Sequence, residues 1–284
     1  MNKFISYFVL FRSFESLLLA GTWVTLLILV ERTDFSFLLL IGMIVWLTNA
    51  GITSWNDSLD LKEDSISHPE RPIPSGIISI REARIVGTMF FISAILLAFS
   101  INLISVIYIL SAIIIGIGYS LVSKKQFLVK NMTVTFAIFF GLVIAINLFS
   151  SNPSSTVYIF ILSIALMLSG YEIIKDFHDV VGDKKAGIET VPLKFWNGAT
   201  TISIFLFFTL SCLLMVLALL LMSLIFEAFI ALLATIGIIF PLYWLIRNPF
   251  PKYAEPIRKI VIVIIGIALL IVTNSIYFKA IGLI

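Results

Sequence analysis

The stretch TTISIFLFFTLSCLLMVLALLLM, residues 200–222, decides the fold class because it contains no charged side chain. A helix needs about 20 mostly apolar residues to cross the hydrocarbon core of a bilayer. Comparable apolar runs lie at residues 14–30, 36–55, 83–101, 104–122, 132–149, 156–174, 224–246 and 259–280. We therefore predict an all-α integral membrane protein with about nine transmembrane helices in a single bundle.

The overall composition supports a membrane protein. Of the 284 residues, 60% are hydrophobic and 12% are charged, whereas a soluble domain carries about 45–50% apolar and roughly 25% charged residues. The net charge of +3 comes with no basic run long enough to follow a nucleic acid backbone. The single cysteine, Cys212, excludes an intrachain disulfide. We predict that residues 1–284 form one polytopic domain.

The distribution of positive charge predicts the orientation. When the connections between the nine runs are assigned alternately to two sides, only Arg32 and Lys279 of the 19 lysines and arginines fall on the second side. Cytoplasmic loops carry an excess of lysine and arginine. We therefore expect a multi-pass protein of the cell membrane with a cytoplasmic N-terminus, and a functional site at the cytoplasmic face, where the long polar connections lie.

Two of those connections carry the same acidic pattern, NDSLDLKED at Asn56–Asp64 and KDFHDVVGD at Lys175–Asp183. Each places aspartates at positions i, i+3 and i+7, which fall within about 60° on one face of a helix. The six residues are Asp57, Asp60, Asp64, Asp176, Asp179 and Asp183. Each triad follows an apolar run, so we expect exposed helix ends whose acids can be replaced by alanine without loss of the fold.

The two triads are separated by four predicted spans, so the chain returns to the same side and the triads can face each other. Facing carboxylates repel one another unless cations neutralise them. Carboxylate oxygens suit hard divalent cations, and Mg²⁺ is typically held by a few carboxylates together with substrate phosphates. We predict that the six aspartates are catalytic residues that bind Mg²⁺ and, through it, a diphosphate.

Three other interpretations compete with this site. Acidic helix ends can be merely solvated, but two copies of one three-point spacing favour a site. A transporter would carry charged groups near the bilayer midplane and inverted repeats, whereas these acids lie at helix ends. A non-catalytic lipid-binding or scaffold protein has no reason to keep six spaced aspartates.

Basic residues lie near the triads. Arg71 belongs to HPERPIPSG, residues 68–76, where prolines stiffen a loop that can lie over the site. Lys124, with Lys125 and Lys130, follows the fourth predicted span. Both residue types suit diphosphate oxygens, although lysines on this side are also expected from the orientation alone. Arg71 and Lys124 are the candidate diphosphate contacts.

These motifs resemble those of the UbiA-type intramembrane prenyltransferase superfamily. Its first motif, N-D-x-x-D-x-x-x-D followed by R-P-(I/L)-x-S-G, occurs as Asn56–Asp64 and Arg71–Gly76. Its second motif is similar to Lys175–Pro192, with Gly182, Gly187 and Thr190 in place. Residues 119–131 look like a segment that follows the fourth helix in the family, except that Ser123 stands where leucine is usual.

The resemblance implies a helical bundle around a cavity that opens to lipid. It also implies Mg²⁺-dependent transfer of a polyprenyl group from a prenyl diphosphate to a lipid or aromatic acceptor, in contact with membrane lipid. The diphosphate contacts that it implies are Asn56, Arg71, Tyr119, Lys124, Asn131 and Lys175.

The acceptor is indicated by the stretch from Tyr171 to Asp176. It looks like the R-E-I-I-K-D stretch of archaeal-type digeranylgeranylglyceryl phosphate synthases, with Tyr171 in place of the usual arginine. The favoured acceptor is geranylgeranylglyceryl phosphate, as in ether-lipid synthesis. An aromatic quinone or chlorophyll-type precursor is the alternative, because related stretches also occur in those branches.

Overall fold

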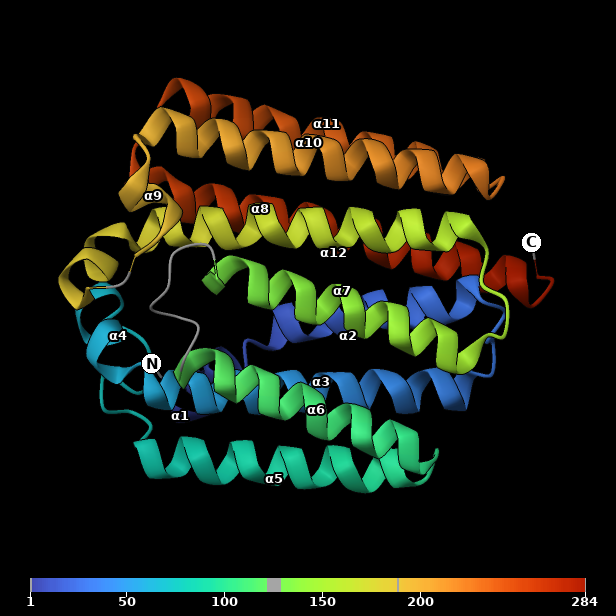
Figure 1. Ribbon diagram of the computed structural model, residues 1–284, viewed down its shortest axis with the longest axis horizontal. Coiled ribbons are helices and arrows are strands. Elements are labelled where there is room, and N and C mark those ends of the chain that lie inside the picture. The colour runs from blue at the N-terminus through green and yellow to red at the C-terminus, as the bar shows by residue number, and fades with distance from the viewer. Residues whose placement is uncertain (1, 122–128, 188, 284) are drawn as a thin grey trace. The chain divides into compact units, whose positions relative to one another are not determined.

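The computed structural model describes residues 2–121, 129–187 and 189–283 (Figure 1). Within these ranges the regular elements are helices, and no strand is present. A short 3₁₀ turn, η2 (Pro251–Tyr253), precedes the last helix. The α-helices are α1 (Lys3–Leu10), α2 (Ser13–Leu29), α3 (Phe35–Leu59), α4 (Leu61–Ser67), α5 (Ile80–Phe99), α6 (Leu103–Leu121), α7 (Val129–Phe149), α8 (Ser155–Ala186), α9 (Val191–Lys194), α10 (Asn197–Leu221), α11 (Ile225–Arg247) and α12 (Ala254–Ala280).

The long helices confirm an all-α protein with several membrane-spanning segments. Among the described residues, 6 helices can each cross a bilayer by length and composition: α3, α5, α8, α10, α11 and α12. Helices α1 and α2 bend by 43° at their junction and would together make a seventh span. The described apolar parts of α6 and α7, Leu103–Gly118 and Thr133–Phe149, are shorter. The count of nine spans and the single bundle stay predictions.

The chain divides into two compact units. The first contains Met1–Val24, Asp34–Lys125 and Lys185–Gly187, and the second contains Thr25–Thr33, Gln126–Lys184 and Ile188–Ile284. The first aspartate motif therefore belongs to the first unit and the second motif to the second unit. The expectation of one polytopic domain stays a prediction.

In the first unit, α3 packs against both α5 and α6 (Figure 1). The α3–α5 crossing is close because glycines stand on both helices. A Cβ atom on Gly87 would lie 2.8 Å from the Trp55 ring and 3.1 Å from the Gly51 carbonyl oxygen. Small residues allow helix backbones to approach in this way in membrane proteins. The crossing fixes the part of α3 that runs into the first aspartate motif.

A second core in this unit joins α1 to the loop between α4 and α5. Leu10, Ile73, Ile78 and Ala83 are all buried there and form one cluster. Burying a large aliphatic side chain stabilises a fold by about 1.5–3 kcal/mol. Leu10 lies two residues before Arg12, and Ile73 lies two residues after Arg71. The cluster therefore fixes the backbone positions from which both arginine side chains extend.

The core of the second unit is formed by α8, α9, α10, α11 and α12. Phe177 of α8, Phe208 of α10 and Leu245 of α11 are 0%, 1% and 0% exposed. Phe177 follows Asp176 directly, so the C-terminal part of α8 is anchored in the core at the level of the second motif. The packing holds that motif on a fixed helix.

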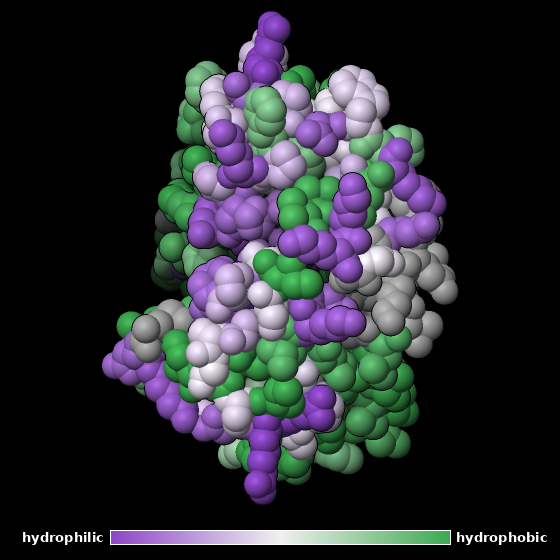
Figure 2. All heavy atoms as spheres, turned by 90° about the vertical axis from the view of Figure 1, so that its left-hand side faces the viewer, coloured by the Kyte–Doolittle hydropathy of each residue, from purple (hydrophilic) through white to green (hydrophobic). Residues whose placement is uncertain are grey.

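Hydrophilic side chains gather around the end of α3 that leads into α4. The corner between α3 and α4, on the left of Figure 1, belongs to the face that Figure 2 presents. Purple, hydrophilic residues are dense on this face, whereas green, hydrophobic residues cover more of its flanks (Figure 2). The first aspartate motif thus lies at a polar end of its helix, as the order of apolar and polar segments predicts.

Candidate functional site

The first motif lies across a helix junction. Helix α3 ends at Leu59, and Asp60, with φ −92° and ψ 8°, separates it from α4. Backbone hydrogen bonds of the α-helical type continue on both sides, from the Asp60 N–H to the Asn56 oxygen (3.0 Å) and from the Asp64 N–H to the Asp60 oxygen (2.8 Å). The prediction of one continuous helical face through Asp57, Asp60 and Asp64 is therefore wrong at Asp60, because the backbone of this residue leaves the helical conformation.

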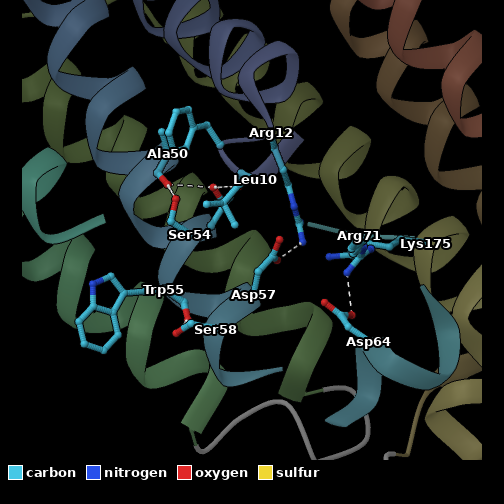
Figure 3. A network of polar contacts seen from close by, with 12 residues as sticks. Leu10, Arg12, Ala50, Ser54, Trp55, Asp57, Ser58, Asp64, Arg71 and Lys175 are labelled. Atoms are coloured by element: carbon cyan, nitrogen blue, oxygen red, sulfur yellow. Dashed lines mark hydrogen bonds and ion pairs between the residues drawn. The ribbon is translucent and has the colours of Figure 1, made fainter. Parts of the chain in front are cut away.

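Asp57, in the last turn of α3, forms an ion pair with Arg12. The Arg12 Nη2 donates to the Asp57 Oδ1 at 3.0 Å (Figure 3). The side chain of Asp57 is 7% exposed and that of Arg12 is 25% exposed. A carboxylate that is this deeply buried needs a charged or hydrogen-bonding partner. The guanidinium supplies that partner from the break between α1 and α2.

Asp64, in α4, forms the matching pair with Arg71. The Arg71 Nη1 donates to the Asp64 Oδ1 at 2.7 Å, and the two side chains are 24% and 9% exposed (Figure 3). The other carboxylate oxygen of Asp64, Oδ2, is buried and has no hydrogen-bond partner among the described residues. The Oδ1 atom of Asn56 is also buried without a hydrogen-bond partner among the described residues. Unsatisfied buried oxygens are rare in native structures and call for an explanation.

Arg12 occupies a strained backbone position between α1 and α2. Its φ angle is +42°, a left-handed conformation that costs a residue with a side chain about 1–2 kcal/mol. The break is tied to α3 by two hydrogen bonds, from the Asn49 Nδ2 to the Ser16 Oγ (2.9 Å) and from the Thr53 Oγ1 to the Leu10 oxygen (3.4 Å). Asn49, Thr53 and Asp57 follow one another at i, i+4 and i+8, so one face of α3 meets the break.

The loop that carries Arg71 is fixed by its own hydrogen bonds. The Ser75 N–H donates to the Arg71 oxygen (3.0 Å), and the Ile78 N–H donates to the Pro72 oxygen (3.0 Å). Gly76 has a φ of +75°, which a residue with a Cβ adopts only with strain. The R-P-I-P-S-G segment is therefore a rigid turn that holds Arg71 over α4.

The second motif lies within one helix. Asp176, Asp179 and Asp183 all belong to α8, which continues to Ala186 and ends before Gly187 at φ +70°. A left-handed glycine is a common end of a helix. Asp176 is 0% exposed and Asp183 is 7% exposed. Within this unit the i, i+3, i+7 spacing does place the three aspartates on one helical face.

The burial of the aspartates corrects one expectation. We predicted exposed helix ends, where alanine would leave the fold intact. Asp57 and Asp176 are instead buried, at 5% and 0% exposure. The reason is tertiary: Asp57 is covered by the α1–α2 break, and Asp176 precedes the core residue Phe177. Replacement of either acid by alanine should therefore also disturb its surroundings.

Three polar side chains stand on α8 at the start of the second motif, namely Tyr171, Glu172 and Lys175. Lys175 lies 3.8 Å from the Glu172 Oε2, and Glu172 is buried. Tyr171 accepts a hydrogen bond from the Arg258 Nη1, and the Arg258 guanidinium lies 5.4 Å from the centre of the Tyr171 ring. Arg258 is held by Glu255 through bonds of 2.6 and 2.9 Å. The structure thus places a guanidinium beside position 171, from α12.

Sequence reasoning did not single out Arg12 or Arg258. Both were counted only as inner-side charges, which any membrane protein carries. No local pattern marks Arg12, because its partner Asp57 lies 45 residues further along the chain. Other candidates fall where the structure gives no side chain: Lys124 lies outside the described residues, as do the side chains of Tyr119 and Asn131.

The donor set fits a hard divalent cation. The first motif offers carboxylate oxygens and the amide oxygen of Asn56, which are the ligand types that Mg²⁺ takes. The Asp64 Oδ2 and the Asn56 Oδ1 are buried oxygens that lack hydrogen-bond donors. A cation at this corner would satisfy such oxygens, so the residues present fit the predicted metal.

The chain is similar in sequence to named proteins of archaea. Digeranylgeranylglyceryl phosphate synthase of Methanosarcina mazei is 31% identical over 155 residues, which are 55% of this chain and 54% of that protein. The enzyme of the same name from Methanothermobacter thermautotrophicus is 30% identical over 196 residues, 68% of this chain and 66% of that protein. The matches thus span between about half and two thirds of the length of these curated relatives.

Solved structures share the fold. A UbiA homolog from Archaeoglobus fulgidus bound to DMAPP and Mg²⁺ has a TM-score of 0.72 at 16% identity, over 98% of this chain and 100% of that chain. A structure from work on digeranylgeranylglyceryl phosphate synthase in membranes has a TM-score of 0.64 at 24% identity, over 99% and 100%. Residues 17–263 match the sequence profile of the UbiA prenyltransferase family. With that match over most of its length, the chain belongs to the UbiA prenyltransferase family.

Proposed function

We propose that this protein transfers a polyprenyl group from a prenyl diphosphate to an acceptor in a Mg²⁺-dependent reaction. The observation that carries the proposal is the α3–α4 corner, where the buried Asp57 and Asp64 stand beside Arg12 and Arg71. Alternating carboxylates and guanidiniums suit a metal and a diphosphate respectively. Because the chain belongs to the UbiA prenyltransferase family, prenyl transfer is the reaction that we assign to this charge pattern.

The reaction needs a site that binds a leaving group and excludes water. The bond between C1 of the prenyl chain and the diphosphate oxygen breaks, and its electron pair leaves with the diphosphate. The acceptor oxygen forms the new bond to C1, and its proton passes to the departing diphosphate. Mg²⁺, when bound, offsets the charge of the leaving group. Arg71 and Lys175 are the candidate residues to contact the diphosphate oxygens, together with Asn56 and, from the family resemblance, Tyr119, Lys124 and Asn131.

The second motif completes the site in this proposal. Asp176, Asp179 and Asp183 would hold metal for the same diphosphate as Asp57, Asp60 and Asp64. The even number of predicted spans between the motifs supports their facing each other on one side of the membrane. We propose nine spans in a single bundle, with a cavity that opens to lipid, because a polyprenyl tail is as apolar as the lipid around it.

The location follows from the charges. We propose a multi-pass protein of the cell membrane with its N-terminus in the cytoplasm and its active site at the cytoplasmic face. The concentration of lysine and arginine on one side of the predicted spans supports this orientation. The hydrophilic end that carries the α3–α4 corner is consistent with it (Figure 2).

We propose geranylgeranylglyceryl phosphate as the acceptor. The sequence relatives named digeranylgeranylglyceryl phosphate synthase support this choice. Tyr171 precedes Asp176 by five residues, which is about 7.5 Å along a helix. A phosphate on the acceptor would need a cationic partner, and the Arg258 guanidinium beside Tyr171 is the candidate.

A competition assay tests both the reaction and the acceptor. The purified full-length protein receives geranylgeranyl diphosphate, Mg²⁺ and a mixture of geranylgeranylglyceryl phosphate, 4-hydroxybenzoate and 1,4-dihydroxy-2-naphthoate, and products are identified by mass spectrometry. We expect the prenylated glyceryl phosphate, with its share reduced in Arg258→Gln. A prenylated aromatic product would contradict the lipid acceptor and keep the transferase. The absence of any product, with diphosphate also not released, would contradict the proposed reaction.

A further inference from the structure

The two arginines at the first motif contact carboxylates, whereas a residue that only binds diphosphate would be expected to keep its guanidinium free for phosphate. Arg12 and Arg71 lie on Asp57 and Asp64, at 3.0 and 2.7 Å, and these two carboxylates are predicted metal ligands (Figure 3). A guanidinium and a metal ion on one carboxylate repel each other in a partly dry site. A metal that binds at Asp57 and Asp64 therefore weakens the bonds of both guanidiniums to these carboxylates.

From this geometry we propose that Arg12 and Arg71 exchange partners, and so couple the binding of metal to the binding of diphosphate. Each guanidinium neutralises a carboxylate when metal is absent and turns to the diphosphate when metal takes that carboxylate. The inference rests on the proposed function, since it assigns a regulation to the same site. It adds Arg12, which no motif marks, to the residues that control substrate loading.

Charge balance explains why the two ligands bind together. Without ligands, two guanidiniums balance two buried carboxylates. Metal alone takes the two carboxylates from the guanidiniums and leaves these cations unpaired beside it, and diphosphate alone brings negative charge to the carboxylates of the motif, Asp60 included. When both arrive, the added charges largely cancel and the guanidiniums gain the phosphate oxygens that they bind well in fork geometry. Each ligand is therefore disfavoured alone and favoured in the presence of the other.

The surroundings limit the exchange to side chains. Arg12 stands on a break that is tied to α3 by Asn49 and Thr53, and Arg71 stands on a loop whose Ile73 is buried beside Leu10. Both backbones are held, whereas the guanidiniums are about one quarter exposed, at 25% and 24%. A long side chain on a fixed backbone can swing from one oxygen to another without movement of a helix. The Asp64 Oδ2 is buried and has no hydrogen-bond partner among the described residues, so a metal can first contact Asp64 at this oxygen while Arg71 still holds Oδ1.

The test measures binding rather than activity. Mn²⁺, as a probe for Mg²⁺, is titrated into the purified protein and followed by the electron paramagnetic resonance of free Mn²⁺. The titration is repeated with geranylgeranyl thiolodiphosphate, a substrate analogue that does not react, and association of Mn²⁺ with the analogue in buffer is subtracted. The ratio of the two metal dissociation constants is the coupling factor, and allosteric couplings usually amount to about 5–150-fold.

Arg12→Gln should tighten binding of Mn²⁺ alone and lower the coupling factor by about fivefold or more. Arg71→Gln should do the same, and it keeps the test available if Arg12→Gln does not fold. Arg84→Gln is the matched control, because Arg84 is hydrogen-bonded to Ser58 (3.1 Å) instead of to a motif carboxylate. Its coupling factor should equal that of the wild type.

Two results would overturn the exchange. If Arg12→Gln and Arg71→Gln bind Mn²⁺ alone no more tightly than the wild type, the guanidiniums do not compete with metal. If Arg84→Gln changes the coupling factor as much as they do, the effect is general electrostatics. A wild-type protein that binds no Mn²⁺ even with the analogue would contradict the proposed function itself, which is a distinct outcome.

Discussion

At the scale of single residues, the buried charge of Asp57 is the central feature of the proposed site. Its carboxylate is 7% exposed and is stabilised by a guanidinium that lies 45 positions earlier in the chain. Removal of one member of such a pair leaves the other charge in a poorly solvated place, which costs more than the pair contributes. If Arg12 is removed together with Asp57, no unpaired charge is left behind. The double variant therefore separates the role of Asp57 in metal binding from its role in stability.

We predict that Asp57→Ala lowers the free energy of unfolding by about 1–3 kcal/mol, because the Arg12 guanidinium loses its buried partner. The double variant Asp57→Ala with Arg12→Met should recover most of that loss while transfer stays absent in both. Thermal unfolding in detergent, followed by tryptophan fluorescence, measures the first effect. Wild-type stability in the single variant would show that the ion pair contributes nothing to the fold.

Some of the site could be predicted from the sequence and some could not. The aspartate spacing is local, so the sequence alone predicts the six aspartates of the two motifs as candidate metal ligands. Burial and partners depend on tertiary contacts, so the chain alone suggested exposed acids. Arg12 contacts Asp57 only because the α1–α2 break packs on α3, and no periodic pattern records that contact.

At the scale of helices, the α3–α5 crossing positions the first motif. Gly51 and Gly87 let the two backbones meet, and Trp55 and Ser54 lie against Gly87 just before Asp57. The apolar runs predicted α3 and α5 well, because a membrane helix needs a long apolar stretch whatever it packs against. The end of α3 was not predicted, because the break at Asp60 falls inside a spacing that is also compatible with one continuous helix.

Gly87→Leu should destabilise the first unit by about 1–3 kcal/mol and reduce transfer, because its Cβ would meet the Gly51 carbonyl at 3.1 Å and backbone cannot move aside. Gly118→Leu is the control, since a Cβ there has nothing within 4 Å. Unfolding midpoints and turnover of the two purified variants can be compared directly. Equal stability of both would mean that the crossing tolerates larger residues and does not position the motif.

At the scale of the whole molecule, the unequal distribution of charge has two exceptions, and the structure explains both. Arg32 donates two hydrogen bonds to the Phe149 oxygen, at 2.8 and 2.6 Å, at the C-terminal end of α7. Lys279 forms an ion pair at 2.8 Å with Glu227, which is fully buried at the start of α11. Basic groups satisfy carbonyls at helix C-termini, and a buried acid needs a counter-charge. Both cations are therefore structural, and the predicted orientation stands on the remaining lysines and arginines.

The measurement that tests the central claim most directly is the dependence of prenyl transfer on Mg²⁺ in wild type, Asp64→Asn, Asp183→Asn and the neighbouring control Glu63→Gln. We predict that EDTA stops product formation in the wild type and that added Mg²⁺ restores it. Glu63→Gln should behave as the wild type, whereas both aspartate variants should lose at least about 100-fold in turnover, as expected when a key electrostatic group is removed. Turnover that survives chelation, or an aspartate variant with near-full Mg²⁺-dependent activity, would contradict a reaction centred on the two aspartate motifs.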